Sequence, residues 1–489
     1  MILNVVPVIH AQGNTPDILL IMPDQMRGDC LSIAGHPVLR TPTLDNLAQQ
    51  GVLFRRAYTP VPSCIPARFA LLTGLSPQTS GVVGYKEKTV NSPTLPECLS
   101  LAGYKTVLVG RYMHQNEESG SLGYETRILG STYVADDDYD TFLRQAAPAS
   151  GGIRNLVEEQ GLTYNFWQAK PWPLDDDLHP TEWVVREARR IVEQTDGGTR
   201  LFLTASFYAP HPPLFPPAEY FNHYMQQQLP GPAMGDWVDQ TDLLPGGNQN
   251  GHRILLKGEM LHRAQAGYFG LIEHLDAQIA LLIDDFKQRS EKNGRNWLIV
   301  FTSDHGEMLG DHGFFRKCEP YEGSANIPFI VCASPSLGFE AGKHSMQPVC
   351  LEDIMPTLLS LAGAPLPSNL DGVSLLPVLQ GNDQSIRPWL HYEHATCYSE
   401  EQAFHALTDG HYKYIWRPSD GSEQLFDLDE DIAEINDLSE NKNYQTRLLT
   451  WRDRLVKLLA SRPEGFVQQG RLVPGRPYPP LNEGITLKK

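Results

Sequence analysis

The chain has 489 residues and a formal net charge of −18 at pH 7. Hydrophobic residues make up 41% and charged residues 20%, which is an ordinary globular composition and excludes a long disordered chain. This length corresponds to roughly three domains of average size, which is enough to form a large buried core. The acidic balance argues against a general nucleic-acid binder, because such proteins carry a basic surface.

The cysteines and the first residues bear on the compartment. An odd number of cysteines without a C-x-x-C pair argues against a disulfide framework or a cysteine zinc site, and implies at least one free or chemically special thiol. No apolar run reaches the ~18 residues of a membrane span. Residues 1–13 hold an apolar stretch and a small-residue site at His10-Ala11-Gln12, which predicts a signal remnant of a periplasmic or secreted protein. Because no basic residue precedes the stretch, an ordinary first segment of a cytoplasmic protein is the alternative.

Short apolar runs alternate with helical patterns over most of the chain. The expected strands are 17–22, 106–110, 201–206, 297–302 and 328–332, and the expected helices include 43–50, 183–194 and 261–286. This alternation predicts an α/β fold with a large, mostly parallel central sheet flanked by helices. Ligands of open α/β sheets bind at the carboxyl ends of the strands, so the polar residues that follow four of these runs predict one site. These residues are Asp24 and Gln25; Arg111, Tyr112 and His114; His211; and Asp304 and His305.

The pattern changes from about residue 385. Short runs separated by turns such as Asp409-Gly410 and Asp420-Gly421 predict antiparallel hairpins, and a helix is expected over 443–461. Residues 365–372 are the expected junction. We therefore expect a catalytic α/β domain over 14–372 and a smaller α+β subdomain over 373–489, with an antiparallel sheet, a helix and a tail.

The segment that carries the chemistry begins at Cys64. Pro66 and Arg68 follow it at the start of an apolar helical pattern that reaches Gly74. The exposed N–H groups at a helix N-terminus favour an anion, and Arg68 adds a positive charge one turn further along. A buried cysteine that starts a core helix is the alternative, because free cysteines are commonly buried.

Cys64-Ile-Pro-Ala-Arg68, followed by Leu71-Leu-Thr-Gly74, resembles the signature of the type I sulfatases of the alkaline phosphatase-like superfamily. Further points of resemblance extend over roughly residues 15–460: Asp24-Gln25, Pro210-His211-Pro212, Ser303 to Glu307, Lys317, Asp353 to Thr357, Asp371-Gly372 and Leu425 to Leu428. The resemblance implies that Cys64 is oxidised after synthesis to formylglycine, an aldehyde that is hydrated in the resting enzyme. A separate formylglycine-generating enzyme would be required for this maturation.

The resemblance also assigns metal ligands and catalytic roles. The metal ligands would be Asp24, Gln25, Cys64 as formylglycine, Asp304 and His305. Mainly oxygen donors favour a hard ion such as Ca²⁺ or Mg²⁺ over Zn²⁺. The resemblance implies Ca²⁺, and His305 leaves Mn²⁺ as a further alternative. One oxygen of the hydrated aldehyde would attack sulfur, and the other would drive the return to aldehyde. The remaining catalytic residues would be Arg68, which orients the formylglycine, Lys317, which contacts the sulfate, and His211, which is the general acid for the leaving oxygen.

Several histidines and a tyrosine outside the signature also have expected roles. Tyr112 and His114 follow a predicted strand and are expected to take part in catalysis, with a capped loop as the alternative. His179 is expected to have a structural role, with Thr181 as the cap of the helix that follows. His391 and His394 are expected to pack or to lie on the surface rather than to bind a ligand.

The predicted function is hydrolysis of a sulfate ester of a carbohydrate or an aryl group. The pairing of Asp24-Gln25 with Asp304-His305 departs from the commonest sulfatase pattern and resembles choline sulfatases and phosphonate monoester hydrolases. A phosphonate monoester or phosphodiester hydrolase is therefore the alternative. A non-catalytic binding protein would have lost the residues named above, and a cysteine-nucleophile hydrolase would need a base beside Cys64. Nucleic acid and membranes are not expected partners, and the oligomeric state is left open.

Overall fold

The computed structural model describes residues 15–113, 120–245, 253–382 and 384–482. The predicted signal remnant, residues 1–13, and His114 lie outside the described residues. None of the described helices combines the length and apolar character that a membrane crossing requires.

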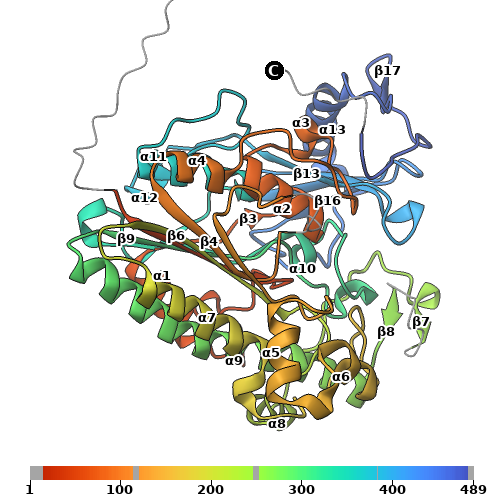
Figure 1. Ribbon diagram of the computed structural model, residues 1–489. Helices are drawn as coiled ribbons and strands as arrows, with labels where there is room; N and C mark the ends of the chain where they lie inside the picture. The colour runs from red at the N-terminus through yellow and green to blue at the C-terminus, as the bar shows by residue number, and fades with distance from the viewer. Residues whose placement is uncertain (1–14, 114–119, 246–252, 383, 483–489) are drawn as a thin grey trace, which may run out of the picture.

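A large central sheet forms the framework (Figure 1). Its strands, in spatial order, are β11 (Lys343–Ser345), β2 (Val52–Phe54), β10 (Phe329–Ala333), β9 (Trp297–Thr302), β1 (Asp17–Asp24), β6 (Arg200–Pro210), β4 (Tyr104–Gly110) and β5 (Thr126–Leu129). Strand β10 runs antiparallel to both of its neighbours, and the other pairs are parallel. The prediction of a mostly parallel sheet is confirmed.

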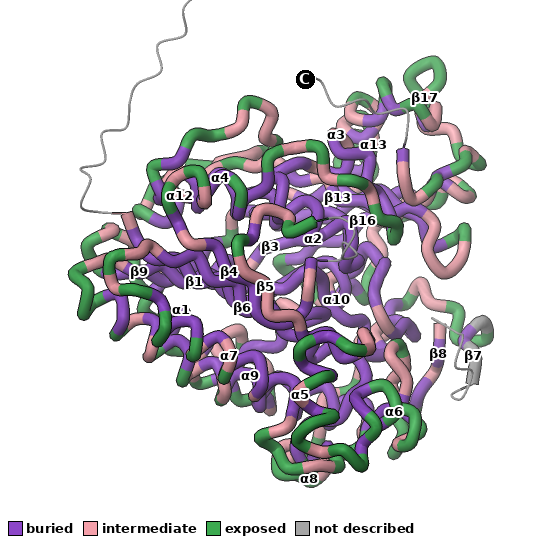
Figure 2. The backbone as a smooth tube through the Cα atoms, in the orientation of Figure 1, coloured by how far each residue is buried: buried purple, intermediate pink, exposed green. Residues whose placement is uncertain are grey.

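Alternate residues of β1 enter two different cores. Leu19 and Ile21 face one cluster of buried side chains, whereas Ile18 and Leu20 face the other. Burial on both faces explains why the strand is a continuous apolar run in the sequence. Figure 2 shows the central strands buried along their length.

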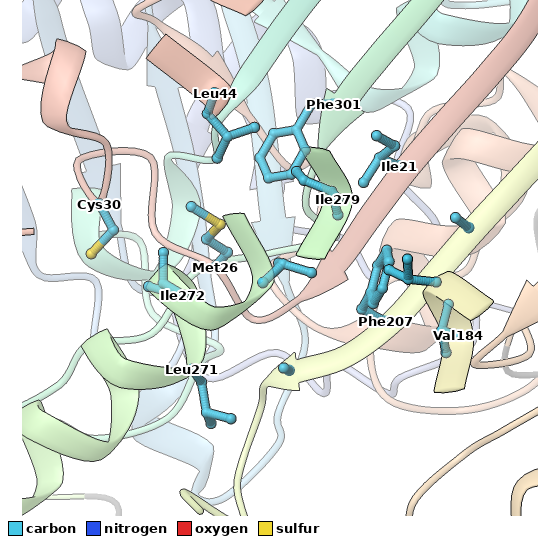
Figure 3. Packing of buried hydrophobic residues seen from close by; sticks show 14 of the residues in the cluster. Ile21, Met26, Cys30, Leu44, Val184, Phe207, Leu271, Ile272, Ile279 and Phe301 are labelled. Carbon is cyan, nitrogen blue, oxygen red and sulfur yellow. The ribbon is translucent and has the colours of Figure 1, made fainter. Parts of the chain in front are cut away.

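Helices cover both faces of the sheet (Figure 1). The first face packs against α1 (Pro42–Gln50), α7 (Pro180–Gln194) and α9 (Gly258–Lys292), and its core continues into α5 (Asp138–Ala146), α6 (Ile153–Glu159) and α8 (Ala218–Met225). Figure 3 shows Leu44 and Ile279 of these helices near Phe301 and Ile21 of the strands, and Val184 near Phe207 of β6. The second face packs against α2 (Cys64–Thr73), α4 (Leu95–Leu101), α11 (Ile354–Ala362) and α12 (Leu376–Leu379).

The C-terminal part contains the predicted antiparallel sheet. Its strands follow one another in space as in sequence: β13 (Leu390–His394), β14 (Phe404–Thr408), β15 (Tyr412–Trp416) and β16 (Glu423–Asp427). One face packs against α13 (Gln445–Leu459). The other packs against Tyr58 and Tyr321, which come earlier in the chain. The predicted domain boundary at residue 372 stays a prediction.

The remaining elements are short. They are α3 (Pro77–Ser80), α10 (Glu322–Ala325) and the strand pairs β3 (Ala57–Tyr58) with β12 (Val349–Cys350), β7 (Leu244–Pro245) with β8 (Ile254–Leu255), and β17 (Val467–Gln468) with β18 (Arg471–Leu472).

Candidate active site

The site lies where four adjacent strands end. Strands β9, β1, β6 and β4 are neighbours in the sheet, so the residues that follow them converge at one edge. Gln25 follows β1 with a φ of 67°, a left-handed conformation that is uncommon for a residue other than glycine. Its backbone N–H donates to Asp304 Oδ1 at 3.1 Å, a bond that ties the end of β1 to the segment after β9.

Helix α2 presents Cys64 to this edge. Cys64 is the first residue of the helix, and all ten residues of α2 are buried. The side chain of Ser63, at the N-cap, does not cap the helix and instead pairs with His394 Nε2 at 2.8 Å. The first N–H groups of α2, at the positive end of the helix dipole, are therefore directed to the site, where they favour an anion.

Arg68 forms ion pairs with both Asp24 and Asp304. Its Nη2 donates to Asp24 Oδ2 and its Nε donates to Asp304 Oδ2, both at 2.8 Å, and all three side chains are fully buried. Each carboxylate is thereby oriented with one oxygen on the guanidinium. The second oxygen of each lies near His305 Nε2, at 3.8 Å for Asp24 Oδ1 and 3.7 Å for Asp304 Oδ1.

These donors form a cluster that fits a divalent cation. The ligand atoms of Asp24, Cys64, Asp304 and His305 lie within 4.8 Å of one another. His305 Nδ1 donates to the carbonyl of Gly306 at 2.9 Å, so its Nε2 carries the lone pair that a metal would use. Two carboxylate oxygens and one imidazole nitrogen suit Ca²⁺, Mg²⁺ or Mn²⁺.

Lys317 lies at the centre of the predicted catalytic residues. Its three N–H donors match three acceptors: Gln25 Oε1 at 2.9 Å, Cys64 Sγ at 3.2 Å and His211 Nε2 at 3.0 Å. The residues on both sides of it, Arg316 and Cys318, have φ values of 73°, so the loop turns sharply to direct the lysine inward. The side chain of Gln25, a predicted metal ligand, accepts from Lys317 through Oε1 and donates to Glu307 through Nε2.

Burial and charge set the protonation states. Burial opposes ionisation of Asp24, yet Arg111 and Arg68 together hold the pKa of its carboxyl below the ordinary value. Burial, followed by the charge of Asp24, raises the pKa of the Cys64 thiol to about 11. A histidine does lie beside the cysteine, with His305 Nε2 3.1 Å from Cys64 Sγ. The raised pKa nevertheless disfavours the thiolate that a cysteine-nucleophile hydrolase requires.

His211 is neutral in the resting site. Burial, and then the charges of Lys317 and Arg111, lower the pKa of its imidazole well below the ordinary value. Its Nδ1 donates to the carbonyl of Pro212 at 2.7 Å, and its Nε2 accepts from Lys317. A proton on Nε2 therefore requires added negative charge beside the ring, such as a bound anionic ester.

Arg111 was predicted to lie at this edge but was given no catalytic or metal-binding role, and Glu307 and His394 were not among the predicted site residues. Arg111 Nη1 forms a buried ion pair with Asp24 Oδ2 at 2.8 Å, and its place directly after β4 was the available signal. Glu307 accepts from the amide of Gln25, which orients that side chain. His394 is fully buried and pairs with Ser63 beside Cys64, so it is part of the wall of the site.

Two predicted positions differ from expectation. The hydroxyl of Tyr112 accepts from Tyr133 at 2.9 Å, and Tyr112 does not line the pocket beside Lys317. His179, not Thr181, is the N-cap of α7, because its Nδ1 accepts from the Thr181 N–H at 3.1 Å. His179 is buried beside Trp172, so its expected structural role agrees with its contacts.

A pocket of about 330 Å³ adjoins His211 and Lys317. Tyrosines form much of its wall, and among the described lining residues none is a carboxylate. Arg111 lies over two of the rings, 4.8 Å from the centroid of Tyr208 and 5.4 Å from that of Tyr133. The lining residues are Tyr85, Arg111, Tyr133, Arg154, Tyr164, Asn165, Tyr208, His211, Lys317, Cys318, Cys397 and Tyr398.

Comparison with known proteins agrees with this geometry. Residues 16–364 match the sulfatase family, and residues 310–461 match the C-terminal region of N-sulphoglucosamine sulphohydrolase. The chain is 36% identical to an arylsulfatase of Clostridium perfringens, with 95% of this chain and 99% of that protein covered. It is 30% identical to a choline-sulfatase of Rhizobium meliloti, over 90% of this chain and 86% of the relative.

A solved structure extends the likeness to a second activity. The phosphonate monoester hydrolase of Agrobacterium radiobacter superimposes with a TM-score of 0.76 at 26% identity, over 91% of this chain and 95% of that one. The sulfatase match and the arylsulfatase relative cover the strand ends, α2 and the Lys317 loop together. The chain therefore belongs to the sulfatase family and is a sulfuric ester hydrolase.

Proposed function

We propose that the chain hydrolyses the sulfate ester of an aryl group or a sugar, with formylglycine at position 64 and Ca²⁺ as the bound metal. The observation that carries the proposal is the arrangement around Cys64. Its Sγ lies 3.1 Å from His305 Nε2 and 3.2 Å from Lys317 Nζ, between a candidate metal cage and a cation that can hold sulfate.

The metal would be held by Asp24, Asp304 and His305, with the oxidised side chain of residue 64 as a further ligand. A bound cation supplies positive charge to the sulfate oxygens and lowers the pKa of the attacking oxygen. The Arg68 bridge supports this role, because it fixes both carboxylates before any ion binds. Among candidate ions, Ca²⁺ tolerates such a site with the least demand on geometry.

The protein's own cations would bind and orient the ester. Lys317 has three acceptors in the resting site, and a sulfate oxygen would replace Cys64 or His211 among them. Arg111, which contacts the same oxygen of Asp24 as Arg68, adds further positive charge. The negative sulfate beside His211 would raise the pKa of that imidazole, so that Nε2 can carry the proton that the leaving oxygen takes.

The pocket wall favours a leaving group with an aromatic ring or an apolar face. Tyr133, Tyr164 and Tyr208 offer ring faces and edges on which an aryl ring or the apolar face of a sugar can stack. A choline group would also contact aromatic rings. Arg111, Arg154 and Lys317 line the same pocket, however, and would repel its positive charge.

A phosphonate monoester or phosphodiester hydrolase is the second candidate. The likeness to the Agrobacterium radiobacter enzyme favours it, as does the pairing of Asp24-Gln25 with Asp304-His305. Because Gln25 is neutral where a second aspartate would add a carboxylate, the site repels an anionic substrate less, which suits either ester.

The test of the proposed function is maturation. The chain is expressed with and without a formylglycine-generating enzyme, and the peptide that contains Cys64 is analysed by mass spectrometry. We expect 4-nitrophenyl sulfate turnover to rise in proportion to the formylglycine content. Equal turnover in samples with unmodified Cys64 would refute the role of formylglycine.

A further inference from the structure

Two thiols meet at the wall of the pocket. Cys318 follows Lys317 directly, and Cys397 lies in the loop after β13. Their Sγ atoms are 3.2 Å apart although 79 positions separate the residues in sequence. Both residues line the same pocket, and neither has a role in the proposed catalytic steps.

Contacts on both loops hold these thiols together. The N–H of Cys318 donates to the carbonyl of Pro62 at 2.9 Å, which anchors this loop beside Cys64. The side chain of Gln402 accepts from the Tyr398 N–H and donates to Glu319, both at 2.9 Å, so it bridges the two loops. These contacts hold the two loops that carry the thiols beside each other.

A metal ion is the other occupant that these thiols could have. The ligand atoms of Cys318, Cys397 and His394 lie within 4.8 Å of one another, which suits a soft cation such as Zn²⁺. The His394 ring is already engaged, because Nδ1 donates to the carbonyl of Ala395 at 2.5 Å and Nε2 accepts from Ser63 at 2.8 Å. The geometry favours a bond between the sulfurs over a three-ligand metal site.

We propose that Cys318 and Cys397 form a disulfide bond that joins the Lys317 loop to the loop after β13. A low-molecular-weight disulfide, such as oxidised glutathione, is the oxidant. The more exposed Cys397 loses its proton and attacks one glutathione sulfur, and one glutathione thiolate leaves. Cys318 then loses its proton and attacks the Cys397 sulfur, which expels the second thiolate. Two electrons pass to the oxidant, and the two released protons go to the leaving thiolates.

The bond would close a long loop between the two parts of the chain. A cross-link over 79 positions restricts the unfolded chain and stabilises the folded one. It also fixes the backbone next to Lys317. Because the sulfurs are already adjacent, we expect turnover to change less than twofold on oxidation.

The test compares the full-length protein after treatment with oxidised and with reduced glutathione. Peptide mapping without reductant is expected to find the segment with Cys318 linked to the segment with Cys397, and two fewer thiols should react with an alkylating reagent. The melting temperature of the oxidised form should exceed that of the reduced form by about 5 °C.

Two variants complete the experiment. Cys397→Ser should remove the linked peptide and the effect of reductant on the melting temperature, while Cys98→Ser, a distant cysteine on α4, should keep both. Full alkylation of both thiols after oxidation would overturn the proposal. Stoichiometric Zn²⁺ binding to the reduced protein that blocks oxidation would also overturn it, in favour of a metal site. Peptide mapping of the unmutated chain tests for the disulfide bond even if Cys397→Ser fails to fold.

Discussion

Replacement of His211 by alanine isolates the proton-transfer step. In the resting site the imidazole accepts from Lys317 at 3.0 Å and is neutral, since burial and Lys317 lower its pKa. The ring contributes to catalysis only when the leaving oxygen needs a proton. General acid catalysis is worth roughly 10²–10⁴-fold in rate, or about 3 to 5 kcal/mol of transition-state stabilisation. We expect a loss of this size for alkyl and sugar sulfates, and a loss of only a few-fold for 4-nitrophenyl sulfate.

The assay is kcat/KM for a series of sulfate esters whose leaving groups differ in basicity. In His211→Ala the logarithm of kcat/KM should fall more steeply with leaving-group pKa than in the unmutated enzyme. His344→Ala, an exposed histidine on β11, is the matched control and should give the unmutated slope. An equal loss for every ester would refute the acid role and leave His211 as a substrate-binding residue.

Other predictions concern the nucleophile, the metal cage and the small domain. Cys64→Ala should lower turnover by more than about 10³-fold with an unchanged circular dichroism spectrum; near-normal rates would refute its role. Asp304→Ala should abolish Ca²⁺ binding in calorimetry as well as turnover, and retained binding would place the metal elsewhere. Burial opposes ionisation of Glu393, but Arg462 lowers its pKa from 4.5 to about 2. This stabilisation, about 3 kcal/mol, is present above pH 4.5 and is lost as the pH falls towards 2. Urea unfolding should show a flatter pH profile for Glu393→Gln, and an unchanged profile would contradict the assignment.

The sheet could be predicted because local signals and burial agree. Residues 18–22 and 297–301 are apolar without interruption, and both strands are buried on two faces. The Asp409-Gly410 and Asp420-Gly421 turns likewise mark the hairpins, with Gly410 and Gly421 at positive φ. The same strands place Asp24 and Asp304 at one edge, so the position of the site followed from the fold.

Other parts of the site depend on long-range contacts that no local pattern encodes. The residues on both sides of Lys317 adopt left-handed conformations that nothing in Arg316 or Cys318 favours; tertiary contacts hold them there. His394 seemed a packing residue because its partner, Ser63, is 331 positions away. Thr181 has an ordinary side chain for a helix cap, but α7 begins at Pro180, so His179 is the N-cap and its Nδ1 accepts from the Thr181 N–H.

The most direct test of the central claim is a parallel rate assay of the matured enzyme. It compares a 4-nitrophenyl sulfate, a 4-nitrophenyl phosphonate monoester and a phosphodiester, each with Ca²⁺, with Mn²⁺ and with a chelator. We predict the highest kcat/KM for the sulfate, lost on chelation and restored by Ca²⁺. A preference for the phosphonate or the diester, or a sulfatase rate that chelation leaves unchanged, would contradict the account.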